Sequence, residues 1–470
     1  MKPAMQALPV GREPVADTSA LYRRVWRWHF YAGLICLPFL ALMAVTGGLY
    51  VFKVPIESLV YASLRTVDSP PGDALDAETL VSHAVAARPG QAVRFVAPAA
   101  PGRSVEVGVL TPDGTVGVYL DPVTGRVLGE LRDDGRLMEV VKRLHSLAIA
   151  GRWANLWVEV VAGWAIVLVV SGVVLWWPRG RQAGVYRVRG RPAQRMWWRD
   201  LHAVTGVTAS VAILFLAVTG MPWSAYWGQQ FGRLTQELGV GLPPHLFGPG
   251  PASTPLEPAV GHTTPWLLSQ APSPQSEPSH AGHTVAPDSP SDAPVVSSSF
   301  GLNQAARRFA ELDLPLDTPI SLPRGPQGTY AAMSFPDDVR GQRVVHLDRY
   351  SGRVLSDVGY RDYGAAGRVI EWGIQIHTGQ QFGWVNQLVM AVACLAIVGL
   401  AVSAVVMWWK RRPVGRLAAP PRRAGDRAAW SALAVAVALG LLFPLLGASM
   451  VVALLVDALV PHHWHERYGL

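Results

Sequence analysis

Five stretches of this chain are apolar over enough residues to cross a lipid bilayer, and they limit the fold more than any other feature. A spanning helix needs about 20 mostly apolar residues, and in lipid its backbone must satisfy every hydrogen bond internally. Half of the 470 residues are hydrophobic and only 16% are charged. We therefore expect five membrane helices, over Trp26–Phe52, Asn155–Trp177, Leu201–Trp223, Val385–Trp409 and Ala428–Val460.

The net charge of +8 lies in short loops beside these stretches, which argues against nucleic acid as a partner. Residues 178–199 contain seven arginines and no acid, and residues 410–427 contain seven basic residues and one acid. Cytoplasmic loops carry such an excess of positive charge. The pattern predicts a cytoplasmic amino terminus, two extracytoplasmic soluble stretches and, with five helices, a carboxyl terminus outside the cytoplasm.

The residues needed for several common cofactors are missing. Cys36 and Cys394 are the only cysteines, and both fall inside apolar stretches. This excludes a disulfide framework, an iron-sulfur cluster, a thiolate zinc site and covalently attached haem. The sequence also contains no Walker A loop and no dinucleotide-binding glycine motif. Any electrons must therefore come from another molecule.

Two sets of residues recur at constant offsets and indicate an internal duplication. The first set recurs after 173 residues and the second after 232 residues, without gaps. The first set is His29, Gly33, Thr46 and Gly47, matched by His202, Gly206, Thr219 and Gly220. The second set is Gly135, Arg136, Glu139, His145, Gly151, Ser171, Trp176 and Trp177, matched by Gly367, Arg368, Glu371, His377, Gly383, Ser403, Trp408 and Trp409.

The soluble stretches are duplicated as well. Asp121–Leu128 and Asp348–Leu355 share the pattern Asp-x-x-[ST]-Gly-Arg-Val-Leu, which predicts a tight turn between two strands. A helical pattern precedes each copy, at Asp76–Arg88 and Leu302–Leu312, and alternating apolar strands lie between. We expect two small α/β domains. The second contains an insertion, residues 249–299, whose Pro, Ser and Ala content predicts disorder.

Helix geometry suggests how the four histidines pair. At 1.5 Å per residue, His29 and Thr46 lie roughly 26 Å apart, which places His29 near the cytoplasmic end of its helix, with His202 at the same level. His145 and His377 precede their helices on the outer side, on segments expected to break at the glycines that follow. This predicts an inner pair, His29 with His202, and an outer pair, His145 with His377.

Neutral imidazole binds iron, copper and zinc, and paired axial histidines can hold haem. An ionisable residue at membrane depth is a candidate for function. We predict that the four histidines ligate haem iron at two levels; structural hydrogen bonding and a proton path are the alternatives. Four glycines near the histidines, namely Gly33, Gly206, Gly151 and Gly383, either admit a macrocycle or allow close helix packing. No catalytic side chain is predicted.

Other residues have two interpretations each. Arg27 and Arg199 are candidates for binding haem propionates, or for anchoring at a basic membrane face. His462, His463 and His465 in the tail either bind metal or form a solvated end. An interfacial aromatic belt accounts for Trp28, Trp176, Trp177, Trp198, Trp408 and Trp409.

This arrangement resembles the PepSY-associated transmembrane family, also called iron-regulated membrane proteins. The resemblance covers about residues 21–413 and rests on the segments around His29 and His202, the two Asp-x-x-[ST]-Gly-Arg-Val-Leu turns and the two His-to-Trp-Trp segments. It implies an inner-membrane protein with two bis-histidine haem b groups that reduces a periplasmic ferric siderophore or other ferric chelate. A membrane quinol or a cytoplasmic reductase would supply the electrons.

Two other functions stay open on the sequence alone. One is a non-catalytic membrane module whose outer domains bind a peptide, a peptidase or a metal chelate, and the other is a transporter, in which repeats are common. All three functions share one predicted map of segments. It runs tail 1–25, helix 26–52, domain 53–135, histidine segment and helix 136–177, loop 178–199, helix 200–223, domain 224–366, histidine segment and helix 367–409, loop 410–427, helix 428–460 and tail 461–470.

Overall fold

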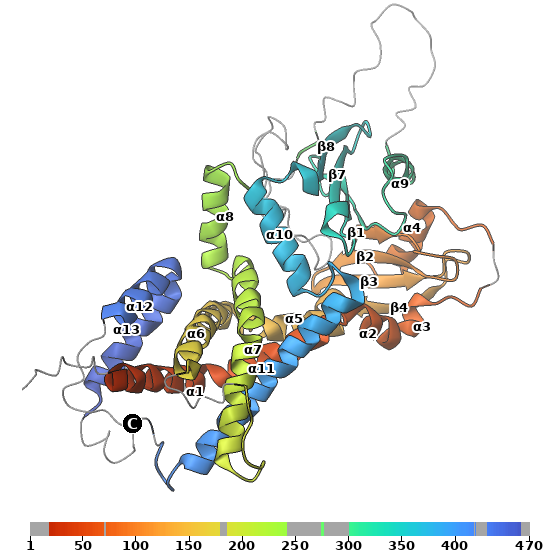
Figure 1. The fold of residues 1–470 in the computed structure, drawn as a ribbon. Coiled ribbons are helices and arrows are strands. Elements are labelled where there is room, and N and C mark those ends of the chain that lie inside the picture. Colours follow the sequence, from red (N-terminus) through yellow and green to blue (C-terminus); the bar gives the residue numbers. More distant parts are fainter. Residues whose placement is uncertain are drawn as a thin grey trace, which may run out of the picture. The chain divides into compact units, whose positions relative to one another are not determined.

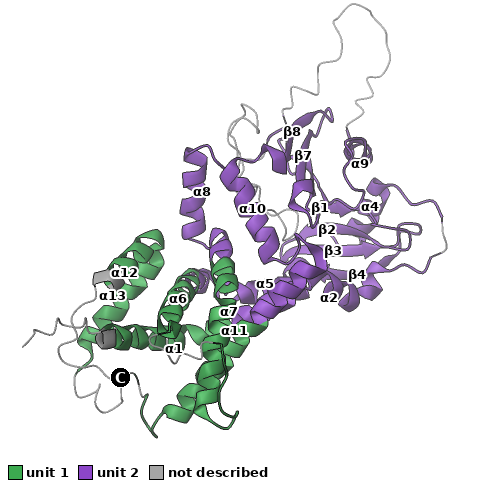
Figure 2. Cartoon of the chain, in the orientation of Figure 1, with its two compact units in different colours: residues 1–41, 159–217, 395–470 green, residues 42–158, 218–394 purple. Residues whose placement is uncertain are grey.

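The computed structural model describes residues 18–69, 72–178, 186–241, 274–276, 300–417, 419 and 430–461. These residues fall into two compact units, coloured separately in Figure 2. Unit 1 comprises residues 1–41, 159–217 and 395–470, and unit 2 comprises residues 42–158 and 218–394. The predicted disordered insertion, apart from residues 274–276, and the histidines of the tail lie outside the described residues.

Four long helices in the described part of the chain are apolar enough to cross a membrane. They match the first four predicted stretches, so a membrane protein built on helices is confirmed. Each is uninterrupted because its apolar run contains no internal breaker except Pro38, which a membrane helix tolerates. The four are α1 (Thr18–Tyr50), α6 (Arg152–Trp176), α7 (Arg195–Gly220) and α11 (Gly383–Arg411).

The fifth apolar stretch differs from the prediction, because it forms two helices instead of one. These are α12 (Trp430–Leu442) and α13 (Pro444–Leu459), which lie side by side in Figure 1. Pro444 lacks a backbone N–H and ends the first helix. A Cβ atom added to Gly447 would lie 2.7 Å from the carbonyl oxygen of Gly440, so glycine is needed where the helices cross. Each helix is shorter than a membrane span requires.

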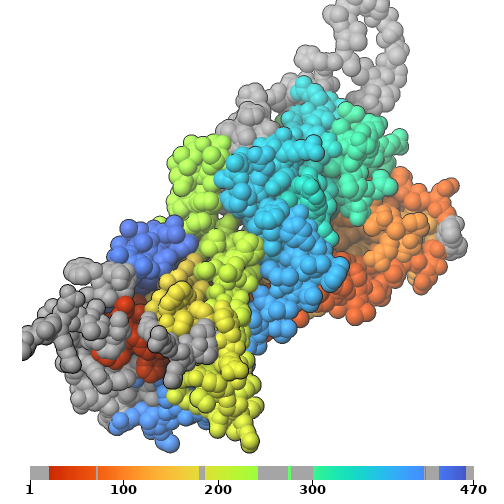
Figure 3. Space-filling model, viewed as in Figure 1, coloured from red at the N-terminus to blue at the C-terminus, as the bar shows by residue number. Residues whose placement is uncertain are grey.

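This helical hairpin packs on the rest of unit 1 through α6 and α1. Leu446 packs against Gly163, and the indole N–H of Trp164 donates a 3.0 Å hydrogen bond to the Ser449 hydroxyl. Near the other end of α13, Asp457 accepts a 3.3 Å hydrogen bond from Arg27. In the space-filling view, the blue surface of the hairpin adjoins the yellow surface of α6 (Figure 3).

Unit 2 contains one antiparallel sheet of eight strands where we expected two separate domains. The edge strands of the two copies, β1 and β5, pair through Arg94 with Ser321 and through Phe95 with Ile320. The order is β4-β3-β2-β1-β5-β6-β7-β8, so each half repeats the same meander. The strands are β1 (Gln91–Val96), β2 (Val105–Thr111), β3 (Gly114–Leu120), β4 (Val127–Arg132), β5 (Ile320–Ser321), β6 (Thr329–Ser334), β7 (Arg343–Asp348) and β8 (Val354–Gly359).

One face of the sheet is covered by the two predicted helices, now α4 (Ala77–Ala87) and α9 (Leu302–Glu311). Their apolar side chains share a single core with alternate residues of the strands. The repeated turns also agree with the prediction. Gly125 and Gly352 both have φ of 68°, a conformation that favours glycine, and the preceding aspartates accept backbone N–H bonds across each turn.

The other face of the sheet lies against the helices that carry the outer histidines. These are α5 (Leu137–His145) and α10 (Ala365–His377), and each ends at its histidine. The expected breaks are present: Gly151, with φ of 93°, precedes α6, and Gly383, with φ of 59°, is the first residue of α11. Short helices α2 (Lys53–Val60), α3 (Ala62–Arg65) and α8 (Trp227–Glu237), which we did not predict, complete the unit.

Candidate functional site

The inner histidines, His29 on α1 and His202 on α7, lie together within unit 1. Their ring centroids are 6.4 Å apart and their planes are almost perpendicular, at 89°. In the sequence, the repeat was the only basis for predicting that these two residues pair. The structure places them in the same pair that the 173-residue offset predicts.

The outer histidines form a second pair within unit 2. The ring centroids of His145 on α5 and His377 on α10 are 6.5 Å apart, with an interplanar angle of 87°. The two pairs therefore have nearly the same internal geometry, although their histidines come from different repeat sets. The structure pairs each histidine with its repeat equivalent and so matches the predicted inner and outer pairs.

Each histidine uses Nδ1 for a hydrogen bond to a hydroxyl group on a neighbouring helix. His29 contacts Ser171 at 2.9 Å and His202 contacts Ser403 at 3.0 Å. In the outer pair the hydroxyls belong to threonines of the membrane helices α1 and α7. His145 contacts Thr46 at 3.2 Å and His377 contacts Thr219 at 2.9 Å.

These contacts favour a proton on Nδ1. The hydroxyls of Ser171, Ser403 and Thr46 also lie within hydrogen-bond distance of backbone carbonyls of their own helices, at 2.6, 2.9 and 2.7 Å. A hydroxyl that donates to its helix carbonyl accepts from the imidazole Nδ1–H. His145 also approaches the Met43 carbonyl at 3.0 Å, which can only accept. The lone pair of Nε2, the atom that ligates a metal, is then available.

Sequence reasoning noticed these hydroxyl residues but gave them no role. Thr46 and Thr219 recur at the 173-residue offset, and Ser171 and Ser403 recur at the 232-residue offset, so the signal was present. A polar residue that is duplicated along with a candidate ligand indicates a partner for that ligand. The Met43 carbonyl had no such signal, because a backbone group leaves no trace in residue identity.

Glycines lie directly against three of the four imidazole rings. A Cβ atom added to Gly172 would lie 3.3 Å from Cε1 of His29, and one added to Gly47 would lie 3.1 Å from Cε1 of His145. Gly220 has the same relation to His377, at 3.5 Å. A larger residue at Gly172 or Gly47 would push its ring aside. These glycines therefore keep the rings close to their neighbouring helices.

The glycines singled out from the sequence act differently. A Cβ atom on Gly33 would make only an ordinary contact with Leu168, at 3.8 Å, and one on Gly206 would contact Leu400 at 3.6 Å. Close helix packing accounts for both. Gly151 and Gly383 are needed for their positive φ at the helix breaks.

The spacing of each pair suits one metal ion between two imidazoles. An imidazole nitrogen lies about 2.0 to 2.1 Å from a bound first-row metal, so two imidazoles on opposite sides of one ion have centroids about 6 Å apart. The observed 6.4 and 6.5 Å agree with this geometry. Burial lowers the pKa of His145 and His377, and His145 lowers that of His377 further, which favours the neutral, ligating form.

The donor set also restricts the kind of metal site. Among the described residues, no group of three or more His, Cys, Asp and Glu side chains could hold a metal ion. A bare zinc or copper ion usually needs three or four protein ligands. Two opposed histidines suffice where a macrocycle supplies the remaining ligands, as in haem proteins. The residues present therefore fit haem better than a bare ion.

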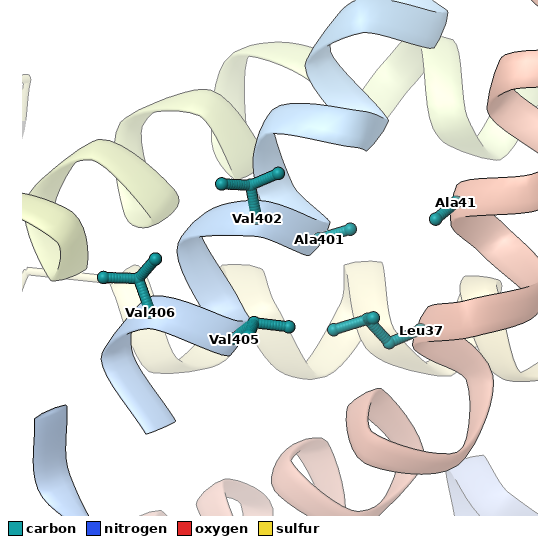
Figure 4. A pocket seen from close by; sticks show the side chains of 6 residues that line it. All are labelled: Leu37, Ala41, Ala401, Val402, Val405 and Val406. Atoms are coloured by element: carbon teal, nitrogen blue, oxygen red, sulfur yellow. The ribbon is translucent and has the colours of Figure 1, made fainter. Parts of the chain in front are cut away.

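Unit 1 also contains an apolar hollow between α1 and α11, shown in Figure 4. Its volume is about 290 Å³. Leu37 and Ala41 of α1 face Val405 and Ala401 of α11 across it, and the lining offers no hydrogen-bonding group to a polar ligand. Such an apolar lining suits contact with a hydrocarbon group and not with a polar ligand. The residues are Leu37, Ala41, Ala401, Val402, Val405 and Val406.

The two arginines proposed for haem propionates both bind carboxylates of the chain. Arg27 pairs with Asp457 at 3.3 Å and lies over the ring of Tyr31. Arg199 pairs with Asp200 at 2.8 Å, and Arg189 shares that carboxylate at 2.7 Å. These contacts give both arginines a structural role, and propionate binding by either stays a prediction.

The sheet positions the outer histidine helices by two different means. In the first half, Arg136 at the start of α5 binds Glu106 at 2.6 Å and Asp133 at 2.8 Å, and Arg94 binds the same two carboxylates. In the second half, Ile374 of α10 packs into an apolar cluster of the sheet. Both helices are thus fixed to the same face of one sheet.

Comparison with protein families gives a match over most of the chain. A family model described as the PepSY-associated TM region matches residues 26–411, which include all four histidines and both halves of the sheet. The search of curated proteins found no match.

Proposed function

The chain belongs to the PepSY-associated TM region family, and from this premise and its two imidazole pairs we propose that it is a di-haem b oxidoreductase of a bacterial inner membrane. It would move electrons across the membrane and reduce a ferric siderophore or another ferric chelate in the periplasm. The observation that carries the proposal is the repeated pair of imidazoles, with ring centroids 6.4 and 6.5 Å apart and each ring bonded to a hydroxyl through Nδ1.

The chain's own residues would bind and orient. His29 and His202 would hold one haem, and His145 and His377 the other. Haem b would supply reversible one-electron iron chemistry at each level. The hydroxyl partners hold the proton at Nδ1 and the apolar helices exclude water.

The two ends of the electron path have different partners. The sequence provides no nucleotide site, so a membrane quinol or a cytoplasmic reductase would deliver electrons at the inner pair. The outer pair lies in unit 2 beside the soluble sheet, which favours delivery to a water-soluble ferric chelate. Adding an electron lowers the charge on ferric iron and so weakens an oxygen-rich chelate.

The hairpin changes the topology that we propose. Arg27 marks the cytoplasmic end of α1, and its bond to Asp457 brings the end of α13 to that same end. Residues after 461 would then be cytoplasmic, not periplasmic as five spanning helices predicted. Both termini and both basic loops would lie inside the cell.

A reduced-minus-oxidised absorption spectrum of the purified protein tests the function. We expect a b-type haem signal with two haems per chain. Changing any one of the four histidines to Ala should lower the haem content by about half, because the haem at that level would lose one of the two histidines that would hold it. His83→Ala, which removes a histidine of α4 bonded to the Gly125 carbonyl in the turn between β3 and β4, is the control and should keep both haems. A colourless wild type would favour a binding module or a transporter.

Reporter fusions test the topology. Fusions after Arg191 and Arg416 should be cytoplasmic, and a fusion at Ser276 should be periplasmic. A fusion after residue 461 decides between a hairpin and a fifth span. A periplasmic result there would show that α12 and α13 cross the membrane together.

A further inference from the structure

We propose that Ser171, Ser403, Thr46 and Thr219 are positioning residues that fix the rotation and tautomer of the four imidazoles, so that the two ligand planes at each level are held perpendicular. This inference rests on the proposed function, because its consequences appear only when haem is bound. It assigns a role to four hydroxyl groups outside the ligand set.

The first argument is that the same contact occurs four times. Every histidine of the two pairs meets a hydroxyl through Nδ1, at distances from 2.9 to 3.2 Å. The inner hydroxyls belong to serines that follow the outer histidines along the chain, and the outer hydroxyls belong to threonines that follow the inner histidines. Helix packing alone does not require a hydroxyl at all four positions.

The second argument concerns direction. Ser171, Ser403 and Thr46 each lie within hydrogen-bond distance of a carbonyl of their own helix. A hydroxyl that donates to such a carbonyl accepts from the imidazole, and that fixes both the tautomer and the plane in which Nδ1–H points. Ser171 and Ser403 are buried at 8% and 1% exposure, so water does not compete for them. Each ring is thus held at Nδ1 by the hydroxyl, and in three cases a glycine allows the close approach.

The third argument is the ring geometry itself. The two planes are perpendicular to within a few degrees in both pairs, although the inner and outer ligands lie on different helices. The angle between axial imidazole planes controls the electronic structure of low-spin ferric haem. Perpendicular planes give a strongly anisotropic EPR signal at low field, whereas near-parallel planes give an ordinary rhombic signal.

Electron paramagnetic resonance of the oxidised full-length protein tests the proposal. The wild type should show two strongly anisotropic low-spin signals. Ser171→Ala and Ser403→Ala should retain both haems, convert the inner signal toward the rhombic type and shift the midpoint potential of that haem only. Thr46→Val and Thr219→Val should do the same to the outer haem. Ser171→Thr, which keeps a hydroxyl at this position, should keep the wild-type signal.

A serine on the same helix as His202 gives a matched control. Ser210 bonds only the carbonyl of Val207 in its own helix, so Ser210→Ala should change neither signal. Unchanged spectra and potentials in all four hydroxyl variants, with haem still bound, would overturn the proposal and leave the proposed function intact. A wild type without haem would instead overturn the proposed function.

Loss of the inner haem from a variant is also informative. If Ser171→Ala loses it and Ser171→Thr retains it, the hydroxyl is needed to hold His29, as proposed. Loss from both variants would contradict the proposal, because side-chain size next to Gly172 and not the hydroxyl would then decide binding.

Discussion

The inner and outer histidine pairs have the same ring geometry but are built from different supports. The inner pair is held by four apolar helices, with serines of α6 and α11 behind the rings. The outer pair sits at the ends of two helices that a soluble sheet holds in place. Duplication therefore reproduces the ring geometry and the hydroxyl contacts more closely than it reproduces their surroundings.

The largest effect should come from removing an outer ligand. A His377→Ala protein should still accept electrons at the inner pair from a quinol or cytoplasmic donor, because His29 and His202 lie in the other unit. It should fail to reduce a ferric chelate supplied from the periplasmic side. Difference spectra and chelate reduction in vesicles measure the two steps separately.

An undiminished rate of chelate reduction in His377→Ala would remove the outer pair from the path. The His29→Ala variant provides the opposite case. It should be blocked at the first step, and the outer haem should then be reducible only by a chemical reductant added outside.

The next largest effect should come from the contacts that hold the outer histidine helices, which differ between the two halves of the sheet. Arg136→Ala leaves Glu106 and Asp133 in a buried site with one cation fewer, and such changes cost about 3 to 5 kcal/mol. We expect a lower melting temperature together with selective loss of the outer haem. Arg132→Ala is the matched control, since its pair with Asp134 is exposed to solvent and should contribute little to stability.

A stable Arg136→Ala protein with both haems would show that α5 does not depend on the ion pairs. The equivalent change in the second half is Ile374→Ala in the apolar cluster, which should cost about 2 to 5 kcal/mol by leaving a cavity. Salt should alter neither cost much, because both sites are buried.

The two halves should also differ in acid sensitivity. Tyr119 pairs with Glu106 in the first half, and at the matching position His346 pairs with Ala331 in the second. Burial lowers the pKa of His346 from 6.5 to about 4. As the pH falls from about 6.5 to about 4, this imidazole becomes protonated in the unfolded chain but stays neutral in the folded chain. About 3 kcal/mol of the free energy of unfolding is therefore lost.

In the first half, the stabilisation comes from the ionised carboxylate of Glu106, and it is lost at lower pH than the stabilisation that depends on His346. Burial by itself raises the pKa of Glu106, but Arg136 and Arg94 hold it at about 2, below the ordinary 4.5. That contribution, of similar size, is present above pH 4.5 and lost as the pH falls toward 2. Melting temperatures of wild type and His346→Gln, measured as the pH is lowered from 6.5 toward 2, test whether the second half loses its stabilisation before the first. His346→Gln should flatten the curve between pH 6.5 and 4 only.

Sequence reasoning was most successful where a side chain had to be repeated. The paired histidines, the glycine turns and the breaks before α6 and α11 all follow from residue types at fixed offsets. It was wrong where the outcome depends on contact between segments. Pairing of β1 with β5 joins two expected domains through four residues that show no special pattern.

The hairpin shows a second reason for error. Hydropathy counts apolar residues and gives little weight to one proline, so residues 428–460 looked like a single span. The break at Pro444 is stabilised by the approach of Gly440 and Gly447, which becomes visible only after the chain has turned back. Repetition offered no help, because this segment has no counterpart elsewhere in the chain.

The smallest effect tests whether the hairpin supports only the inner pair. Ser449→Ala removes the acceptor for the Trp164 indole, which stacks on Trp28 beside His29 at a centroid distance of 6.0 Å. A hydrogen bond between membrane helices contributes about 0.6 kcal/mol, so amides of α13 should exchange with deuterium roughly threefold faster. Ser210→Ala should leave them unchanged. Because the hairpin lies wholly in unit 1, the inner haem potential should shift slightly and the outer one should not. Equal shifts at both haems would show that the two pairs respond to one common support, and the distinction drawn between them would fail.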